Sequence, residues 1–222
     1  MEITTLLALG SLGGLTGLDA VSFAQTMIAR PVVAGPLAGL IIGDPVSGMW
    51  AGAVLEVLTL NQLPVGAART WDTGPAAVIA AVTLTRVAGG LVGLVLAVGL
   101  GVLVGWVGGW SVHALRHFNA RFVAIDEAAI PPRRLAGGHL AAMAFDFARA
   151  VALTLVALAL VSSLEELGRP GPDARWAAGA LLLASVSLAL GADARVMVGS
   201  RRLLGLFAAA MGLSAALTLW LG

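Results

Sequence analysis

One apolar region, from Pro75 to Val112, limits the folds that this chain can adopt. It is too long for a single membrane-spanning helix of about 20 residues and too short for two full spans joined by a loop. Arg86 and the pair Gly89-Gly90 lie near its middle. We therefore expect a half-length helical leg followed by a full helix that begins at about Gly90, because protein can surround irregular backbone at membrane depth.

The composition places this region in a membrane protein. Hydrophobic residues make up 59% of the chain and charged residues only 11%, against about a quarter charged in soluble domains. The predicted fold is an all-α integral membrane protein, a multi-span helical bundle with broken or re-entrant helices. The chain has no cysteine, which excludes disulfides, thiolate metal sites and cysteine nucleophiles.

The other apolar stretches predict the remaining helices. These are Ile3–Leu18, Gln25–Gly43 and Pro45–Leu63 before the Pro75–Val112 region, and Leu135–Leu164, Trp176–Leu190 and Leu203–Leu221 after it. Because Met1-Glu2 opens the chain without basic residues, we expect no cleaved signal peptide. The sequence divides into a substrate-site half with broken helices (1–112), a cytoplasmic loop (113–134) and C-terminal transmembrane helices (135–222).

The arginines predict the orientation in the membrane. Segment 113–134 has four Arg and segment 191–202 has three, whereas segment 165–175 has two Arg beside three acidic residues. Loops rich in Arg stay in the cytoplasm. We therefore expect 113–134 and 191–202 on the cytoplasmic side and 165–175 outside.

Two glycine rows predict close helix packing. Gly35, Gly39 and Gly43 recur every four residues, and so do Gly101, Gly105 and Gly109. Small residues at this spacing let helix backbones approach one another. We favour packing within the chain over a contact between subunits.

A carboxylate inside an apolar segment is the main functional signal. Glu56 lies within the third predicted helix, and placing such a group in a membrane costs roughly 2.5 kcal/mol or more. Asp44-Pro45 and Asn61-Gln62-Leu63-Pro64 bracket that helix. Broken helices with polar side chains at membrane depth are typical of transporter substrate sites. Carboxylates and amides suit a hydroxyl-rich ligand such as a sugar, and Trp50 or Trp71 could cover its apolar face.

Each of these residues also has a structural interpretation. Glu56 could form a buried ion pair with an arginine, for which Arg30, Arg69 and Arg86 are the candidates. Asp44 is favoured as a turn or cap residue, and Arg30-Pro31 is favoured as a helix end. Asp19 could equally cap a helix or bind a ligand.

The histidines predict no chemistry. His113, His117 and His139 lie in or beside the polar stretch, and we expect none of them to have a metal-binding partner at helical spacing. The chain has no Ser-His-Asp arrangement, phosphate-binding loop or dinucleotide fingerprint. We therefore expect no catalysis by this chain, no metal, no cofactor and no nucleic-acid binding.

The stretch "LDAVSFAQTMIARPVVAGPLAGLIIGDPVSGMWAGAVLEVLTLNQLPVGAA" resembles the membrane subunit IIC of the mannose/fructose/sorbose family of the bacterial phosphotransferase system (PTS). The match is dense over residues 1–80 and weaker in "HFNARFVAIDEAA". The matching features are Leu18-Asp19, Gln25, Arg30-Pro31, Gly39, Gly43-Asp44, Gly48, Leu55-Glu56 and Pro64 to Ala68. Thr70-Trp71-Asp72 replaces the Pro-Pro-Asp of the family.

This resemblance implies a sugar-translocating subunit of the bacterial inner membrane. It would pair with a membrane subunit IID, form a homo-oligomer within the complex, and pass a hexose inward. Cytoplasmic IIA and IIB subunits would carry the phosphate on their own histidines. Taken with the polar residues above, it gives the candidate substrate-binding residues Glu56, Asp72, Gln25, Asn61, Gln62 and Asp19.

Two other functions remain open at this point. The chain could be a non-transporting membrane partner that keeps the fold and serves assembly or regulation. It could also be a secondary carrier that couples transport to ions through Glu56 and Asp72.

Overall fold

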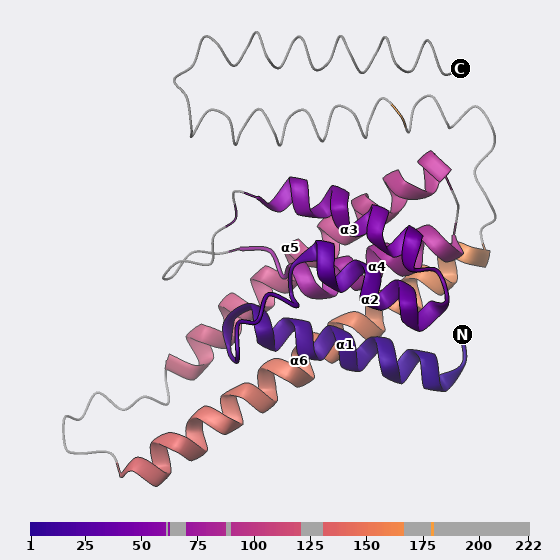
Figure 1. Cartoon of the computed structure of the whole chain (residues 1–222). Coiled ribbons are helices and arrows are strands. Elements are labelled where there is room, and N and C mark those ends of the chain that lie inside the picture. Colours follow the sequence, from indigo (N-terminus) through magenta and orange to yellow (C-terminus); the bar gives the residue numbers. More distant parts are fainter. Residues whose placement is uncertain (61, 63–69, 88–89, 121–130, 167–178, 180–222) are drawn as a thin grey trace, which may run out of the picture.

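The computed structural model describes residues 1–60, 62, 70–87, 90–120, 131–166 and 179 (Figure 1). The helices in these residues are α1 (Ile3–Val21), α2 (Pro31–Ile42), α3 (Pro45–Thr59), α4 (Thr73–Arg86), α5 (Gly90–Ala120) and α6 (Pro132–Glu166). The predicted helices Trp176–Leu190 and Leu203–Leu221 lie outside the described residues, apart from Gly179. The described part of the chain contains no strand, so the prediction of an all-α fold is confirmed.

Three helices of the described chain are long and apolar enough to cross a membrane. They are α1, α5 and the part of α6 from Leu135 to Glu165. The other three helices are too short to do so, because at 1.5 Å per residue even α3 spans only about 22 Å of the roughly 30 Å hydrocarbon layer. The predicted mixture of full spans and shorter, broken helices is therefore present.

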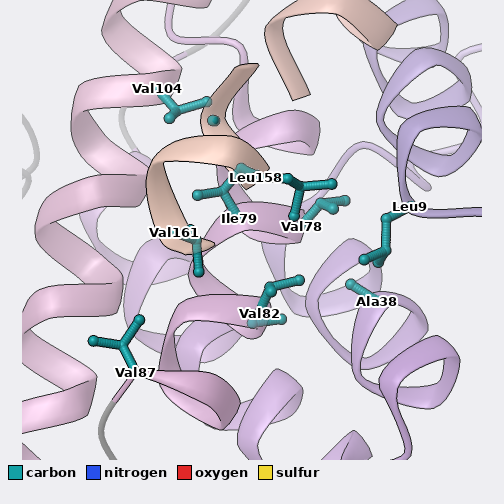
Figure 2. Packing of buried hydrophobic residues seen from close by; sticks show 11 residues of the cluster. Leu9, Ala38, Val78, Ile79, Val82, Val87, Val104, Leu158 and Val161 are labelled. Carbon is teal, nitrogen blue, oxygen red and sulfur yellow. The ribbon is translucent and has the colours of Figure 1, made fainter. Parts of the chain in front are cut away.

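The short helix α4 lies at the centre of the bundle and packs against each of the other five helices (Figure 1). Its segment from Ala76 to Leu84 is buried throughout. Figure 2 shows Val78, Ile79 and Val82 of α4 meeting Leu9 of α1, Ala38 of α2, and Leu158 and Val161 of α6. Protein thus surrounds this half-length leg, as the sequence predicts for the region before Gly90.

The start of the second helix and the end of the third differ from the sequence prediction. The second helix begins at Pro31 rather than Gln25, because Ala24, Gln25 and Met27 adopt positive φ angles of 64°, 53° and 68° that a helix does not allow. Pro31 then occupies the first helical position, where its missing N–H costs nothing. The third helix ends at Thr59 rather than Leu63.

The polar stretch 113–134 is helical at both ends. Helix α5 continues through His113 to Ala120, and α6 begins at Pro132. The predicted helix ends at Val112, where polar residues begin, but no helix breaker follows in the sequence until Pro131-Pro132. Side-chain polarity marks where the apolar span ends and not where the hydrogen-bonded helix ends.

Helices α2 and α3 form a tight hairpin whose backbones touch. A Cβ atom added at Gly35 would lie 2.4 Å from the Gly48 carbonyl oxygen, and one at Gly52 would lie 2.2 Å from the Pro31 carbonyl oxygen. The predicted packing within the chain is therefore confirmed for Gly35 and Gly39, whose added Cβ would lie 2.5 Å from the Asp44 carbonyl oxygen. Gly43 has a different role, because its φ of 83° ends α2 in the left-handed region.

Asp44 begins the second arm of this hairpin. Its Oδ1 accepts a hydrogen bond of 3.0 Å from the Ser47 backbone N–H, which is an N-cap of α3. Thr85, near the end of α4, donates to the other oxygen at 3.4 Å. The cap interpretation of Asp44 is confirmed.

The hairpin gives a testable prediction. Gly48→Ala would place a Cβ 2.3 Å from the Gly35 carbonyl oxygen, so we expect the free energy of unfolding to fall by roughly 1–3 kcal/mol. Chemical denaturation in detergent measures this loss. Gly99→Ala is the control, because its Cβ would meet nothing within 4 Å and alanine favours a helix. Equal stability of the two variants would contradict the tight hairpin.

Candidate functional site

A glycine groove on α5 receives the chain just before α4. The backbone N–H of Asp72 donates a hydrogen bond of 2.9 Å to the Gly105 carbonyl oxygen. A Cβ at Gly109 would lie 2.2 Å from the Thr70 carbonyl oxygen, and one at Gly108 would lie 2.4 Å from the Asp72 Cβ. Only glycines allow this approach, which fixes Asp72 at the start of α4 with 3% of its surface exposed.

An arginine of α6 holds the buried carboxylate of Asp72. The Arg149 Nη1 donates to Asp72 Oδ2 and to Ser111 Oγ, each at 2.9 Å. The Arg149 Nε donates to Asp146 Oδ1, also at 2.9 Å, and Ser22 donates to the other oxygen of Asp146. These five residues are here called the Arg149 cluster. They connect Ser22 at the end of α1 and Asp72 at the start of α4 with Ser111 of α5 and with Asp146 and Arg149 of α6.

The cluster is incompletely hydrogen-bonded. Asp72 Oδ1 is buried and has no hydrogen-bond partner among the described residues. Arg149 Nη2 is also buried without a hydrogen bond there, although it lies 2.9 Å from Asp146 Oδ1. A buried polar group without a partner costs about 1–3 kcal/mol, and more if it is charged. Asp72 therefore presents an acceptor that a water or a ligand hydroxyl would satisfy.

Two cavities lie beside the cluster. The smaller, of about 20 Å³, has Asp72, Thr70, Trp71 and His113 in its wall and is large enough for about one water. The larger, of about 250 Å³, is here called the vestibule. Its polar wall residues are Ser22, Arg116, Asn119, His139 and Asp146, and it shares Val21, Val112 and Arg116 with the smaller cavity.

Glu56 lies in a different contact. It forms an ion pair with Arg30, and its Oε2 accepts a hydrogen bond of 3.3 Å from the Val32 backbone N–H. Arg30 is one of the partners that the sequence analysis allowed. The pair ties α3 to the start of α2, and the Glu56 side chain keeps 14% exposure, so sugar contact by this residue stays a prediction.

Asp19 organises the segment between α1 and α2. Its carboxylate accepts hydrogen bonds from the Thr26 N–H (2.6 Å), the Thr26 hydroxyl (2.7 Å) and the Ala29 N–H (3.1 Å). The Thr73 hydroxyl donates to the Ala29 carbonyl oxygen at 3.0 Å. Through this contact, the segment that Asp19 orders lies against the start of α4, next to Asp72.

The two amide candidates among the described residues, Gln62 and Gln25, lie in different environments. Gln62 Oε1 accepts a hydrogen bond of 2.9 Å from the Trp71 backbone N–H, which helps to place a wall residue of the smaller cavity. Gln25 is exposed on the segment between α1 and α2, and Asn61 lies outside the described residues. The structure therefore brings Asp72, Gln62 and Trp71 together at one end of α4. Trp50, the other aromatic candidate, is 59% exposed on α3.

Arg149 and Asp146 are not among the site residues predicted from the sequence. The prediction for 135–164 is an ordinary apolar span, although "DFAR" interrupts it at 146–149. The reasoning that identified Glu56, the cost of placing a charge in a membrane, applies equally to both residues. What the sequence alone does not reveal is that Arg149 reaches across the bundle to Asp72.

No histidine is predicted to have a metal-binding partner at helical spacing, yet two histidines of α5 form a close pair at that spacing. His113 and His117 are four residues apart on α5, and their Nε2 atoms lie 3.0 Å from one another. Residues at this spacing share a helix face. The described residues contain no group of three or more His, Cys, Asp or Glu that could hold a metal ion.

Comparison with known proteins finds a family model that matches most of the described chain and relatives that each match about a third of the chain. A family model described as the sorbose-specific IIC component of the PTS matches residues 3–166. The chain is 39% identical over 71 residues to the putative N-acetylgalactosamine permease IIC component 2 of Escherichia coli (strain K12), covering 31% of this chain and 53% of that protein. It is 34% identical over 84 residues to the sorbose-specific EIIC component of Klebsiella pneumoniae, covering 37% and 31%.

The matched region thus spans about half the length of the first of these relatives and about a third of the second. A solved structure described as that of a membrane protein has the same fold, with a TM-score of 0.70 at 16% sequence identity. It covers 100% of this chain and 97% of that one. Together with the three apolar helices, these comparisons establish a membrane protein.

Removing Arg149 tests the cluster. Arg149→Met leaves the Asp72 carboxylate buried without its cation, so we expect the free energy of unfolding to fall by about 3–5 kcal/mol. The double variant Asp72→Asn/Arg149→Met should lose less than the sum of the single variants. Unfolding by denaturant in detergent measures both effects.

Arg86→Met is the matched control, because Arg86 pairs with Glu165 while its side chain is 39% exposed. Breaking an exposed pair of this kind costs about 1 kcal/mol or less. Equal losses in Arg149→Met and Arg86→Met would mean that the buried cluster does not stabilise the bundle.

Proposed function

The chain belongs to the family of sorbose-specific IIC components of the PTS, and on that basis we propose that it is a sugar-translocating subunit. It moves a hexose inward across the bacterial inner membrane. Phosphoryl transfer is carried out by partner subunits and not by this chain. The partners are a membrane subunit IID and cytoplasmic IIA and IIB subunits, and the chain forms a homo-oligomer within that complex.

The observation that carries this proposal is the unpaired oxygen of Asp72. One carboxylate oxygen is bound by Arg149, and the other has no hydrogen-bond partner among the described residues. A sugar hydroxyl donates to such an oxygen, and a buried charged acceptor strongly favours ligands that carry the hydroxyl over analogues that lack it. In this proposal Arg149 is the positioning residue that orients the carboxylate.

The surrounding wall supports a sugar as the ligand. Trp71, an aromatic residue, lines the smaller cavity together with Asp72, and the vestibule wall has donors and acceptors on Asn119, His139 and Ser22. Sugars need both kinds of contact, because their rings have apolar faces and polar edges. The proposed site extends beyond the predicted substrate-site half (1–112), which contains Asp72, because Arg149 lies among the C-terminal helices (135–222).

The other candidates have secondary roles in this proposal. Gln62 acts on the sugar through the backbone of Trp71, and Asp19 acts by holding the segment that packs against α4. Glu56, Gln25 and Asn61 are proposed to contact the sugar at a different stage of transport. For Glu56 this requires its ion pair with Arg30 to open.

Orientation can be tested at the end of α5. Asn119 lies in the vestibule wall, and the chain has no cysteine that would react in the background. Because the arginines predict a cytoplasmic 113–134 segment, Asn119→Cys should react with a membrane-impermeant thiol reagent only in inside-out vesicles. Reaction in intact cells would reverse the proposed orientation.

Sugar binding can be tested at Asp72. Asp72→Asn keeps the shape of the side chain but removes the charge, so we expect affinity for the transported hexose to fall at least about tenfold, or roughly 1.4 kcal/mol. Binding is measured on the purified, assembled complex with a panel of sorbose, N-acetylgalactosamine, mannose and fructose.

Asp44→Asn is the matched control, because it is the same substitution at the opposite end of α4, near Thr85. It should leave the affinity unchanged. Glu56→Gln separates the two interpretations of that residue: weaker binding supports a sugar contact, whereas unchanged affinity with lower thermal stability supports a structural pair with Arg30. Normal binding by Asp72→Asn would remove the basis of the proposed site.

A further inference from the structure

Two histidines on the last turns of α5 form a close pair. The Nε2 atoms of His113 and His117 are 3.0 Å apart, and the ring centroids are 4.5 Å apart with the planes at 83°. Both positions lie on one face of a continuous helix, because α5 extends to Ala120. Neither side chain is fully buried, so solutes can reach the pair.

This arrangement is close to that of a chelate. Zinc binds imidazole nitrogens at about 2.0–2.1 Å in tetrahedral geometry, which sets two such nitrogens roughly 3.3 Å apart. The observed 3.0 Å therefore needs only a small rotation of the exposed rings. Paired histidines at this helical spacing are also the ligands of the H-E-x-x-H zinc motif.

We propose that His113 and His117 bind a divalent transition-metal ion such as Zn²⁺ through their Nε2 atoms. Water completes the coordination, because the described residues offer no third His, Cys, Asp or Glu ligand. Arg116, which lies between the two in sequence, carries a positive charge that opposes the metal. The site therefore has a low affinity: it binds metal when the metal concentration rises, and the fold does not require the metal.

The position of the histidine pair links metal binding to the proposed sugar site. His113 lies in the wall of the smaller cavity together with Asp72 and Trp71. A hydrated ion on this residue would crowd the approach to Asp72 and add positive charge there. If the proposed sugar site is correct, bound metal lowers sugar affinity; metal binding itself does not depend on that proposal.

The metal site is tested by zinc titration of the full chain in nanodiscs, with any polyhistidine tag removed. We expect one zinc ion per chain by calorimetry. His113→Ala and His117→Ala should each weaken binding at least about tenfold, or roughly 1.4 kcal/mol. His139→Ala is the control and should bind zinc as the native chain does. Electron paramagnetic resonance with Cu²⁺ should show two coupled imidazole nitrogens.

Unchanged zinc affinity in both His113→Ala and His117→Ala would overturn the site, and so would an equal loss in His139→Ala. The effect of zinc on sugar affinity is tested with His117→Ala rather than His113→Ala. His113 lies in the wall of the smaller cavity, so its loss would itself alter the proposed sugar site. Zinc should weaken sugar binding in the native chain and not in His117→Ala. Zinc binding through the pair with unchanged sugar affinity would overturn the regulatory role and leave the metal site standing.

Discussion

The buried ion pair between Arg149 and Asp72 is the interaction on which the arrangement of this bundle depends. An arginine inside an apolar helix is stable only where carboxylates and hydroxyls meet it, and here Asp72, Asp146 and Ser111 do so. The glycines of α5 let the chain before α4 approach closely enough for this contact. Packing and electrostatics therefore require one another, because the groove places the carboxylate and the arginine compensates its charge.

The same constraint links the fold to the proposed transport function. A half-length helix cannot cross a membrane alone, so α4 places its ends within the bundle, where polar side chains can gather beside small cavities. One end of α4 carries Asp72 and the Arg149 cluster, and the other contacts the cap residue Asp44. The cluster contains two carboxylates for one guanidinium, so an acceptor remains available to a hydroxyl-bearing ligand.

Local signals predicted much of this fold and less of its site. The break near Gly90, the contact of Gly35 with α3 and the cap at Asp44 all follow from glycine, proline and aspartate chemistry that acts over a few residues. The positive φ angles at Ala24, Gln25 and Met27 have no such signal, because those residue types do not favour them. The contact from Arg149 to Asp72 joins positions 77 residues apart, and no local pattern encodes which arginine meets which carboxylate. Such pairing is decided by the packing of the whole bundle.

The most direct test of this account is a thermodynamic cycle between Asp72 and the sugar. Binding of the proposed hexose substrate and of its singly deoxygenated analogues is measured on the native complex and on Asp72→Asn. If the unpaired Asp72 oxygen accepts a hydroxyl, one analogue should show a coupling free energy of about 1.5–3 kcal/mol, the usual contribution of a hydrogen bond to a charged group. Additive losses for every analogue would show that Asp72 does not touch the sugar and would contradict the account.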